Sequence, residues 1–303
     1  YETIADQITG RKASSDDFLS GFHRFAIGLS KKVLIADVLG REVYQVMQSD
    51  LAMLDSTTAW IAILAYAFQI YFDFAGYSDM AIGIGRMLGF RFPENFDNPY
   101  TAASVTEFWR RWHMTFTTFM RLYLYYPLGG NRVKTRRRLY FNLFTVFLVS
   151  GLWHGASWNF VVWGALHGLL LVVERLFLLK VLEKVPKAIG VLYTFIAVLL
   201  VWVPFRLENF SDSLAYYSRL FAFEFGALQF GVKNYIYVTL LLAFFFSMIT
   251  LSSFGKRLQE KLYKVNLNNR EHLLYFGLSL GVLAFCIASL AGWGFSPFIY
   301  FRF

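Results

Sequence analysis

The sequence contains one cysteine, Cys286, and this scarcity excludes several classes of protein. A single cysteine forms neither an intrachain disulfide nor a cysteine metal cluster. The chain also lacks the His-x-x-x-His spacing and the glutamate clusters that hold zinc, and it lacks the Gly-x-Ser-x-Gly elbow of serine hydrolases. We therefore expect no metal site and no serine nucleophile of that type.

Charge is scarce as well, since only 16% of the residues are charged while 57% are hydrophobic. Soluble domains have about 25% charged and about 45–50% apolar residues. This composition predicts an all-α, polytopic integral membrane protein, with tryptophan and tyrosine at the membrane interfaces. The net charge of +9 is concentrated in loops, where it faces anionic lipid, so we expect no nucleic-acid partner.

Long apolar runs are present in place of charge. A helix that crosses a bilayer needs about 20 apolar residues. Five segments come close to this length: residues 58–76, 158–179, 189–205, 235–251 and 273–293. Two further apolar stretches are shorter or mixed: residues 22–39, which carry Lys31 and Lys32 in the middle, and residues 139–151.

The charges of the loops predict the topology. Basic residues outnumber acidic ones in residues 131–138, 180–187 and 256–271, whereas residues 206–233 carry equal numbers of both. Because basic loops remain in the cytoplasm, the first three loops are expected inside and the last one outside. Residues 139–179 must therefore enter the membrane and return.

The sequence SGLWHGASW, residues 150–158, lies at the turning point of this return. The first limb, residues 139–151, is too short to cross the bilayer, at about 20 Å for a helix. Gly151 and Gly155 flank His154 and favour a break in the helix there. We expect a broken, re-entrant helical hairpin that places His154 beside a cavity within the membrane.

Two histidines of this hairpin are candidate catalytic residues. An ionisable group inside a membrane indicates function, and an unprotonated imidazole can act as a general base on a hydroxyl. His154 is the first candidate, and the alternative is a neutral histidine that hydrogen-bonds a neighbouring helix. His167, in WGALHGLLL, is the second candidate, and the alternative there is close packing beside small residues.

The segment EFWRRWHMTFTTFMRLYLYYPLGG, residues 107–130, has apolar residues at helical spacing and is predicted to form an amphipathic interfacial helix. Arg110, Arg111 and Arg121 supply its charge, and arginine suits phosphate. One interpretation is an entrance for a phosphate-bearing donor, with His113 beside it. The alternative is a helix that only lies on the membrane surface.

Acidic residues near the end of the first span have a structural interpretation. Asp73 and Asp79 lie in YFDFAGYSDMAIGIGRMLGF, and Arg86 is the expected partner of Asp79, seven residues later. Glu174 and Arg175 are expected to pair as neighbours at the cytoplasmic end of residues 158–179.

Four long motifs occur in order: YFDFAGYSDMAIGIGRMLGF, FPENFDNPY, FWRRWHMTFTTFMRLYLYYPLGGNR and GLWHGASWNFVVWGALHG. They resemble the membrane-bound O-acyltransferase (MBOAT) family, closest to its bacterial alginate and peptidoglycan O-acetyltransferases and more distantly to D-alanyl transferases. The resemblance runs from about Arg24 to the terminal SPFIYFRF. It implies one domain, residues 1–303, that lacks several membrane helices usually found before Tyr1.

The resemblance also implies an activity. An acetyl group would pass from cytoplasmic acetyl-CoA, with no bound cofactor, to hydroxyls of an exported polysaccharide or peptidoglycan at the bacterial inner membrane. The family's essential histidine matches His154, and a second histidine matches His167. Trp153 and Trp158, with Asp73, would form the pocket. An extracytoplasmic partner protein would complete transfer to the polymer.

Two alternatives remain open. One is D-alanyl transfer from a carrier protein to teichoic acid. The other is a membrane transport subunit without covalent chemistry.

Overall fold

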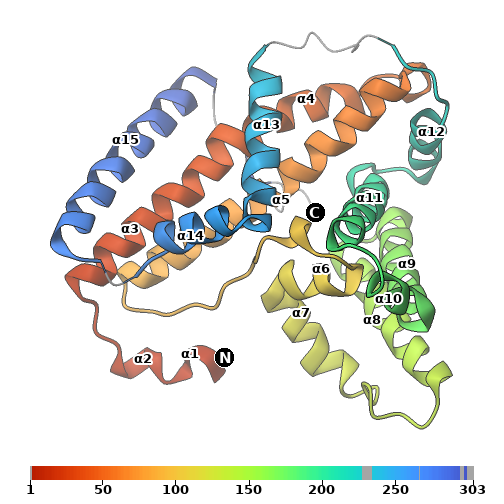
Figure 1. Ribbon diagram of the computed structural model, residues 1–303, viewed down its shortest axis with the longest axis horizontal. Coiled ribbons are helices and arrows are strands. Elements are labelled where there is room, and N and C mark those ends of the chain that lie inside the picture. The colour runs from red at the N-terminus through yellow and green to blue at the C-terminus, as the bar shows by residue number, and fades with distance from the viewer. Residues whose placement is uncertain (1, 227–233, 266, 294–296, 299–303) are drawn as a thin grey trace. The chain divides into compact units, whose positions relative to one another are not determined.

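The computed structural model describes residues 2–226, 234–265, 267–293 and 297–298, and every regular element in that part of the chain is a helix (Figure 1). The all-α class expected from the composition is confirmed. Part of the expected external loop, residues 206–233, and most of SPFIYFRF lie outside the described residues.

The chain forms two compact units, each built from segments far apart in the sequence. The described residues of unit 1 lie within 2–40, 68–95 and 235–298, and those of unit 2 lie within 41–67 and 96–234. The helices α4 (Asp37–Met47) and α5 (Ser56–Met87) divide between the two units, and the first residue of α13 (Asn234–Met248) also belongs to unit 2. The single domain expected from the sequence stays a prediction.

Unit 1 is organised around α3, which pairs with α15 along its length (Figure 1). A capping box between Ser14 and Asp17 starts α3, because each side chain satisfies a backbone N–H of the other residue. The other elements of this unit are α1 (Glu2–Ala5), α2 (Gln7–Gly10), α3 (Ser15–Ser30), the π-helix η1 (Lys31–Ala36), α13 (Asn234–Met248), the 3₁₀ turn η6 (Ile249–Leu251), α14 (Ser253–Leu262) and α15 (Asn269–Trp293).

Unit 2 is organised around the antiparallel pair α8 and α9, against which α11 packs (Figure 1). Its helices are α6 (Val105–Arg111), α7 (Met114–Met120), α8 (Arg136–His154), α9 (Trp158–Val173), α10 (Leu179–Leu182), α11 (Lys187–Arg206) and α12 (Phe210–Leu220). It also contains the 3₁₀ turns η2 (Leu51–Met53) and η3 (Pro99–Thr101), and the π-helices η4 (Arg121–Tyr125) and η5 (Glu174–Leu178).

Three described helices are long and apolar enough to cross a membrane: Ser56–Met87, Lys187–Arg206 and Arg270–Gly292. A fourth candidate, Tyr235–Leu251 with Ser253–Leu262, is bent by 102°. These agree with four of the five expected spans. The fifth, residues 158–179, is divided among α9, η5 and the start of α10, and its span stays a prediction.

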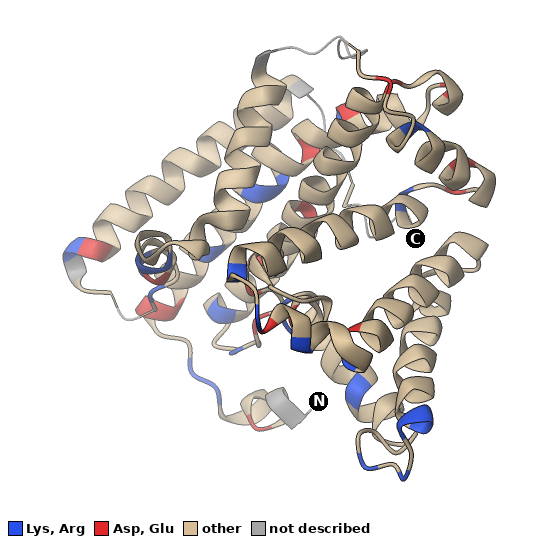
Figure 2. Cartoon of the chain, turned by 45° about the vertical axis from the view of Figure 1, so that its right-hand side comes forward, with Lys and Arg blue, Asp and Glu red and all other residues tan. Residues whose placement is uncertain are grey.

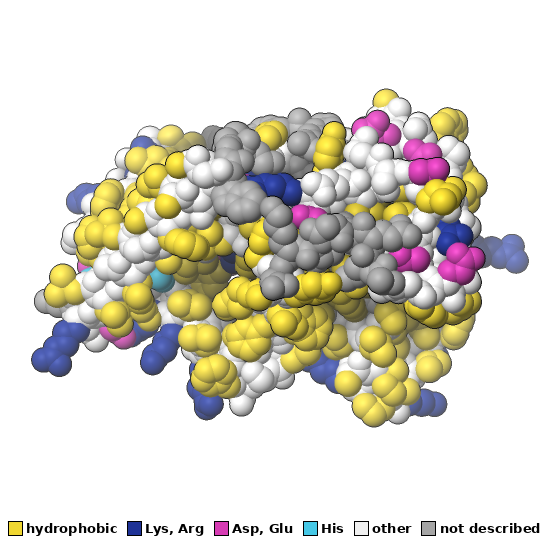
Figure 3. All heavy atoms as spheres, turned by 90° about the horizontal axis from the view of Figure 1, so that it is seen from above, with side chains coloured by type: hydrophobic (Ala, Val, Ile, Leu, Met, Phe, Trp, Pro, Cys, Tyr) yellow, Lys and Arg dark blue, Asp and Glu magenta, His cyan; other side chains and the backbone are white. Residues whose placement is uncertain are grey.

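Apolar side chains remain exposed on the surface of the protein, as a lipid-facing protein requires. The membrane window of Arg270–Gly292 has only 11% of its residues buried, against 78% for Ser56–Met87. Yellow apolar side chains spread over the face viewed in Figure 3. All five basic residues of 131–138 are exposed, and blue segments gather at the loop that leads into α8 (Figure 2).

The structure corrects the expected pairing of Asp79. Arg86 does not hold this carboxylate; Arg24 Nε donates to Asp79 Oδ1 at 2.8 Å, and Lys31 Nζ lies 2.6 Å from Oδ2. Arg24 also binds Glu94, at 3.0 Å. The partners come from α3 and η1 because these elements cross α5, a contact that spacing along one helix does not reveal.

The mixed segment around the two lysines is also built differently from a simple amphipathic helix. The π-helix η1 begins at Lys31, and Lys32 Nζ lies 2.6 Å from both Asp37 Oδ1 and Asp73 Oδ1. Lys32 is buried, with an exposed fraction of 4%. The two adjacent lysines therefore neutralise two aspartates of α5, Asp73 and Asp79, rather than form a polar face.

The helix expected over residues 107–130 is interrupted. It ends at Arg111, and α7 begins at Met114, because His113 takes the left-handed backbone conformation with φ 45°. The indoles of Trp109 and Trp112 are buried, whereas Tyr123 is 70% exposed. The apolar residues at helical spacing thus belong to two short helices and a π-turn, not to one face of a single helix.

Candidate active site

His154 is the last residue of α8, and the chain then passes through an extended Gly155 to α9, which begins at Trp158. The predicted break is confirmed at Gly155, but Gly151 has another role. It lies inside α8, where an added Cβ would collide with the carbonyl oxygen of Phe160. Gly164 of α9 packs against Phe147 in the same way, so these glycines allow close contact between the two limbs.

The first limb is longer than the sequence suggested. Helix α8 contains 19 residues rather than about 13, which gives a length of roughly 28 Å. The first three of these residues are exposed arginines, and α8 is not among the described helices that are long and apolar enough to cross a membrane. The depth of His154 in the membrane stays a prediction.

The imidazole of His154 lies among aromatic rings and is only 7% exposed. The ring centroids of Trp153, Trp163 and Phe205 lie 5.0, 5.0 and 5.1 Å from its own. Phe116 and Phe160 follow at 5.9 and 6.2 Å. Trp163 and Phe205 were missed in the sequence, because only the packing of α9 and α11 brings them to the end of α8.

The two tryptophans predicted to form the pocket differ in position. Trp153 contacts Phe116 with ring centroids 4.5 Å apart, and its indole is still 55% exposed. Trp158 is 78% exposed at the start of α9. The buried indole beside His154 is that of Trp163, which is 1% exposed. The predicted pocket role of Trp158 stays a prediction.

His167 is fully buried, and the side chain of Trp163 separates it from His154. Its Nδ1 accepts a hydrogen bond of 3.2 Å from Trp109 Nε1, and Trp163 lies between the two histidines, 5.0 Å from each ring. Among the described residues, His167 Nε2 has no hydrogen-bond partner. A buried polar atom without a partner is costly, which makes His167 a candidate for binding a substrate or a proton.

His113 joins the same cluster through Phe116, with ring centroids 5.0 Å apart. Burial, together with the nearby His154, lowers the pKa of His113 to about 3. His113 is therefore uncharged at neutral pH. An uncharged imidazole can still donate a hydrogen bond to a phosphate, and the predicted place of His113 beside the donor stays a prediction.

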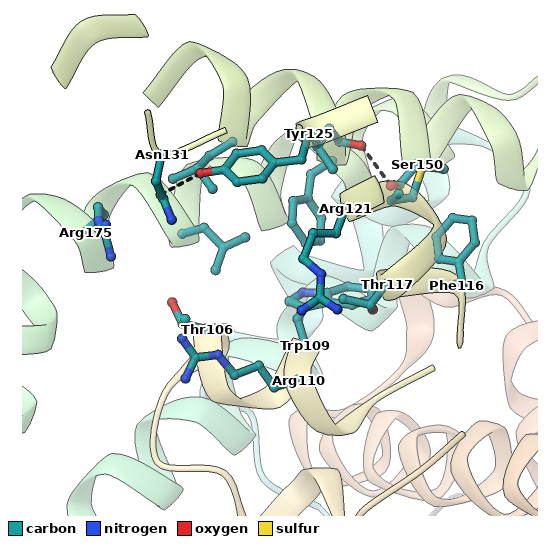
Figure 4. A pocket seen from close by; sticks show the side chains of 15 residues that line it. Thr106, Trp109, Arg110, Phe116, Thr117, Arg121, Tyr125, Asn131, Ser150 and Arg175 are labelled. Carbon is teal, nitrogen blue, oxygen red and sulfur yellow. Dashed lines mark hydrogen bonds between the residues drawn. The ribbon is translucent and has the colours of Figure 1, made fainter. Parts of the chain in front are cut away.

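A pocket of about 220 Å³ opens beside this cluster, between α6, α7, η4 and the pair α8 and α9 (Figure 4). Ligand pockets commonly measure roughly 300–1,000 Å³, so this one suits the end of an extended chain better than a whole nucleotide. Its apolar lining residues are Trp109, Phe116, Met120, Leu143, Val146, Phe147 and Leu171. Phe116 lines the pocket and also contacts His154, so the ring of Phe116 separates the pocket from the candidate base.

Two of the predicted donor-binding arginines line this pocket, and one does not. The side chains of Arg110 and Arg121 border the cavity, together with Arg175 (Figure 4). Arg111 lies outside the lining and binds Glu107 Oε1 at 2.6 Å. Arg175 was assigned to Glu174 from the sequence, and that assignment is wrong, because Glu174 accepts hydrogen bonds from the start of α6 instead.

Asp73 belongs to unit 1, where it pairs with Lys32, and its predicted pocket role stays a prediction. No group of three or more histidine, cysteine, aspartate or glutamate side chains in the described part of the chain is arranged to hold a metal ion.

The profile described as the membrane-bound O-acyltransferase family matches residues 5–205, which include the whole histidine cluster and the pocket. The chain belongs to the MBOAT family. The resemblance inferred from the motifs is confirmed.

Several bacterial MBOAT proteins are similar to this chain. "Probable alginate O-acetylase AlgI" of Pseudomonas putida is 39% identical over 100% of the chain and 65% of its own length. A peptidoglycan O-acetyltransferase of Helicobacter pylori is 46% identical over 64% of the chain and 37% of its own length. A teichoic acid D-alanyltransferase of Streptococcus thermophilus is 33% identical over 46% of the chain and 39% of its own length.

The chain spans only part of the length of these relatives. It also covers only 44% of the length of "Probable alginate O-acetylase AlgI" of Azotobacter vinelandii.

Proposed function

We propose that the protein is a membrane O-acetyltransferase that moves an acetyl group from cytoplasmic acetyl-CoA to hydroxyls of an exported polysaccharide or peptidoglycan. The observation that carries the proposal is the position of His154, buried in its aromatic cluster and separated only by the ring of Phe116 from a pocket with a basic rim. Family membership and the similarity to alginate and peptidoglycan O-acetyltransferases support it.

In the proposed reaction His154 removes the proton of an acceptor hydroxyl as its oxygen attacks the thioester carbonyl. The new C–O bond forms, the C–S bond breaks, and the thiolate leaves and takes the proton from the imidazolium. The products are an acetyl ester and a thiol, so the proton balance closes. His167, with Nε2 unpartnered among the described residues, is proposed to bind the acceptor or the carbonyl oxygen nearby.

The aromatic surroundings of His154 have a chemical role in this proposal. Trp163, Phe205 and Phe116 limit the access of water to the base. Water would compete with the acceptor hydroxyl and hydrolyse the thioester, so its exclusion directs the acetyl group to the acceptor.

The partners follow from the same proposal. The enzyme would lie in the bacterial inner membrane, surrounded by lipid, and an extracytoplasmic protein would complete the transfer to the polymer. The similarity to a teichoic acid D-alanyltransferase supports the alternative function, D-alanyl transfer from a carrier protein to teichoic acid.

The decisive test measures alkali-released acetate from the envelope or exopolysaccharide of cells that express the full-length gene. We expect His154→Ala and His154→Gln to lose at least 100-fold of the ester acetate, since general-base catalysis contributes roughly 10²–10⁴-fold. Leu152→Ala is the matched control, because Leu152 lies in the same helix with its side chain 56% exposed. All variants are compared at equal membrane abundance.

Acetate at the wild-type level in both histidine variants would remove His154 from the chemistry. Purified protein would then distinguish the remaining readings, because turnover of acetyl-CoA excludes a transport subunit without covalent chemistry. Release of D-alanine instead of acetate from the envelope would assign the carrier-fed reaction.

A further inference from the structure

Three arginines from three separate elements meet at the rim of the pocket. Arg110 lies in α6, Arg121 begins η4, and Arg175 lies in η5 (Figure 4). The side chains of these three arginines form no salt bridge or hydrogen bond with another described residue, and no aspartate or glutamate is among the described lining residues. Gathering like charges is unfavourable unless an anion joins them. The rim is therefore built for a ligand with negative charge.

The neighbouring Arg111 shows what an arginine with a structural role looks like in the same helix. It binds Glu107 Oε1 at 2.6 Å, lies 4.0 Å from Asp97 Oδ2, and also donates to the hydroxyl of Thr101 at 3.3 Å. Its charge is neutralised within the protein. Arg110, one residue earlier, differs: its charge has no such partner in the described protein and borders the pocket, where a ligand can bind it.

Glu174 connects two of the elements that carry the rim. Its carboxylate is 1% exposed and accepts hydrogen bonds from Val105 N at 2.6 Å and from Thr106 N and Oγ1 at 2.8 and 2.6 Å. These are the first donors of α6, which a carboxylate satisfies well. Thr106 lies one helical turn before Arg110, and Glu174 directly precedes Arg175. The contact therefore sets the spacing between Arg110 and Arg175.

The inner part of the pocket is apolar and ends at Phe116, beside His154. A ligand that fits must combine a phosphate-bearing end with a slender, uncharged arm. Arginine binds phosphate oxygens with paired N–H groups, more specifically than lysine does. A thioester on a phosphorylated pantetheine arm has this combination.

We infer that Arg110, Arg121 and Arg175 together bind a phosphate group of the thioester donor, and that Glu174 is the positioning residue that holds Arg175 opposite Arg110. This inference rests on the proposed acetyl transfer. It replaces Arg111 by Arg175 in the donor site and gives the buried Glu174 a role in donor affinity.

The first test compares two donors with the purified full-length protein: acetyl-CoA, and S-acetylpantetheine, which has no phosphate. Arg175→Ala should raise the KM for acetyl-CoA about tenfold and leave kcat unchanged, because a charge-assisted contact to phosphate is lost. The KM for S-acetylpantetheine should not change. Arg111→Ala is the matched control, and its ratio of the two KM values should equal that of the wild type.

The second test addresses Glu174. Glu174→Gln should raise the KM for acetyl-CoA but not for S-acetylpantetheine, and its effect should be less than additive with Arg175→Ala, because both act on one contact. Glu183→Gln, at an exposed glutamate nearby, is the control. A merely structural role would lower the activity with both donors equally and add to the effect of Arg175→Ala, which would overturn the positioning role.

Lipid headgroups also carry phosphate, so the assay is run in vesicles of phosphatidylcholine alone and in vesicles with phosphatidylglycerol added. We expect the Arg175→Ala effect in both. An effect that appears only with the anionic lipid would show that the rim binds headgroups and would overturn the inference.

Failure of this inference can be distinguished from failure of the proposed function. Wild-type transfer from both donors with equal KM values would leave acetyl transfer intact and remove phosphate recognition. If no acetyl transfer occurs, calorimetric titration with CoA still tests the rim, since wild type and Arg111→Ala should bind about tenfold more tightly than Arg175→Ala. Equal affinities there would refute the phosphate site by itself.

Discussion

Each unit contains a cluster of buried ionisable side chains, and these two clusters are built in opposite ways. In unit 1, Lys32 lies between Asp37 and Asp73, and Asp79 lies between Arg24 and Lys31, so each buried charge has an opposite charge within 2.6–2.8 Å. In unit 2, His154 and His167 are buried among tryptophan and phenylalanine rings. Both arrangements remove ionisable groups from water, but only the first one neutralises them.

The difference separates structural from chemical uses of a buried polar group. A carboxylate in an ion pair is held in one state and resists a change of protonation. An imidazole among apolar rings can be uncharged and ready to accept a proton, at a lower cost in desolvation than a charged group would have. We infer that unit 1 uses its charges to hold its helices in register, while unit 2 surrounds two histidines with uncharged aromatic rings.

The largest expected effect is the removal of one charge from unit 1. Lys32→Met leaves Asp37 and Asp73 buried without their cation, which should cost about 3–5 kcal/mol of unfolding free energy. The effect is measured by SDS-induced unfolding in mixed micelles, followed by circular dichroism. Lys180→Met, at an exposed lysine, is the control.

Adding Asp73→Asn to Lys32→Met should recover part of the lost stability, because it removes one of the uncompensated charges. Equal stability of Lys32→Met and Lys180→Met would show that the buried ion pairs of Lys32 do not stabilise unit 1.

The next effect concerns a feature that the units share, the close approach of helices at glycine. An added Cβ at Gly28 would lie 2.6 Å from the carbonyl oxygen of Gly76, whereas Gly277 of α15 has no atom within 4 Å. Gly28→Ala should destabilise by about 1–3 kcal/mol through overpacking. Gly277→Ala should be neutral or stabilising by up to about 1 kcal/mol, since alanine favours the helix.

Gly164→Ala provides the same measurement in unit 2, where the added Cβ would meet the carbonyl oxygen of Phe147. The thermal midpoints of the three variants in one detergent compare them directly. If Gly28→Ala and Gly277→Ala melt together, the close contact contributes nothing to stability.

The smallest effect is a pH dependence in unit 2. Burial holds the pKa of His113 at about 3, below its value of about 6.5 in an unfolded chain. Between these values the unfolded state binds the proton more readily, so this group lowers stability as the pH falls below about 6.5. His113→Asn cannot titrate there and still suits the left-handed backbone of this position.

When the pH is lowered from 7.5 to 5.5, we therefore expect the unfolding free energy of His113→Asn to fall by about 1 kcal/mol less than that of the wild type. The unfolding midpoints at these two pH values give the difference. An identical pH response in both proteins would show that His113 does not contribute to acid sensitivity.

Local patterns in the sequence predicted the parts of the site that lie within one segment. The glycine after His154 and the small residues of α9 indicated a helix break and a close hairpin, because the conformational freedom and size of glycine act locally. The predicted end of the first helical limb was wrong by several residues, because Gly151 and Gly155 looked like equivalent helix breaks in the sequence. Only the packing of Phe160 against Gly151 distinguishes them.

Residues that meet across segments were beyond prediction. Arg110 and Arg111 are adjacent and identical in type, and spacing assigned both to the donor. The structure pairs one with Glu107 and places the other on the pocket. Arg175 was missed for the same reason, because its neighbour Glu174 binds α6 from a position 68 residues later than Thr106.

The sequence by itself determined the helical class, most of the candidate membrane helices and the family, and it pointed to His154 as the candidate base. Each of these depends on composition, apolar run length or a contiguous motif, which are properties of the chain before it folds. The tertiary structure alone decided which aromatic rings enclose His154, which arginines remain unpaired and which cations hold Asp73 and Asp79. These depend on distances between helices that are remote in the sequence, and such distances are set only when the helices pack.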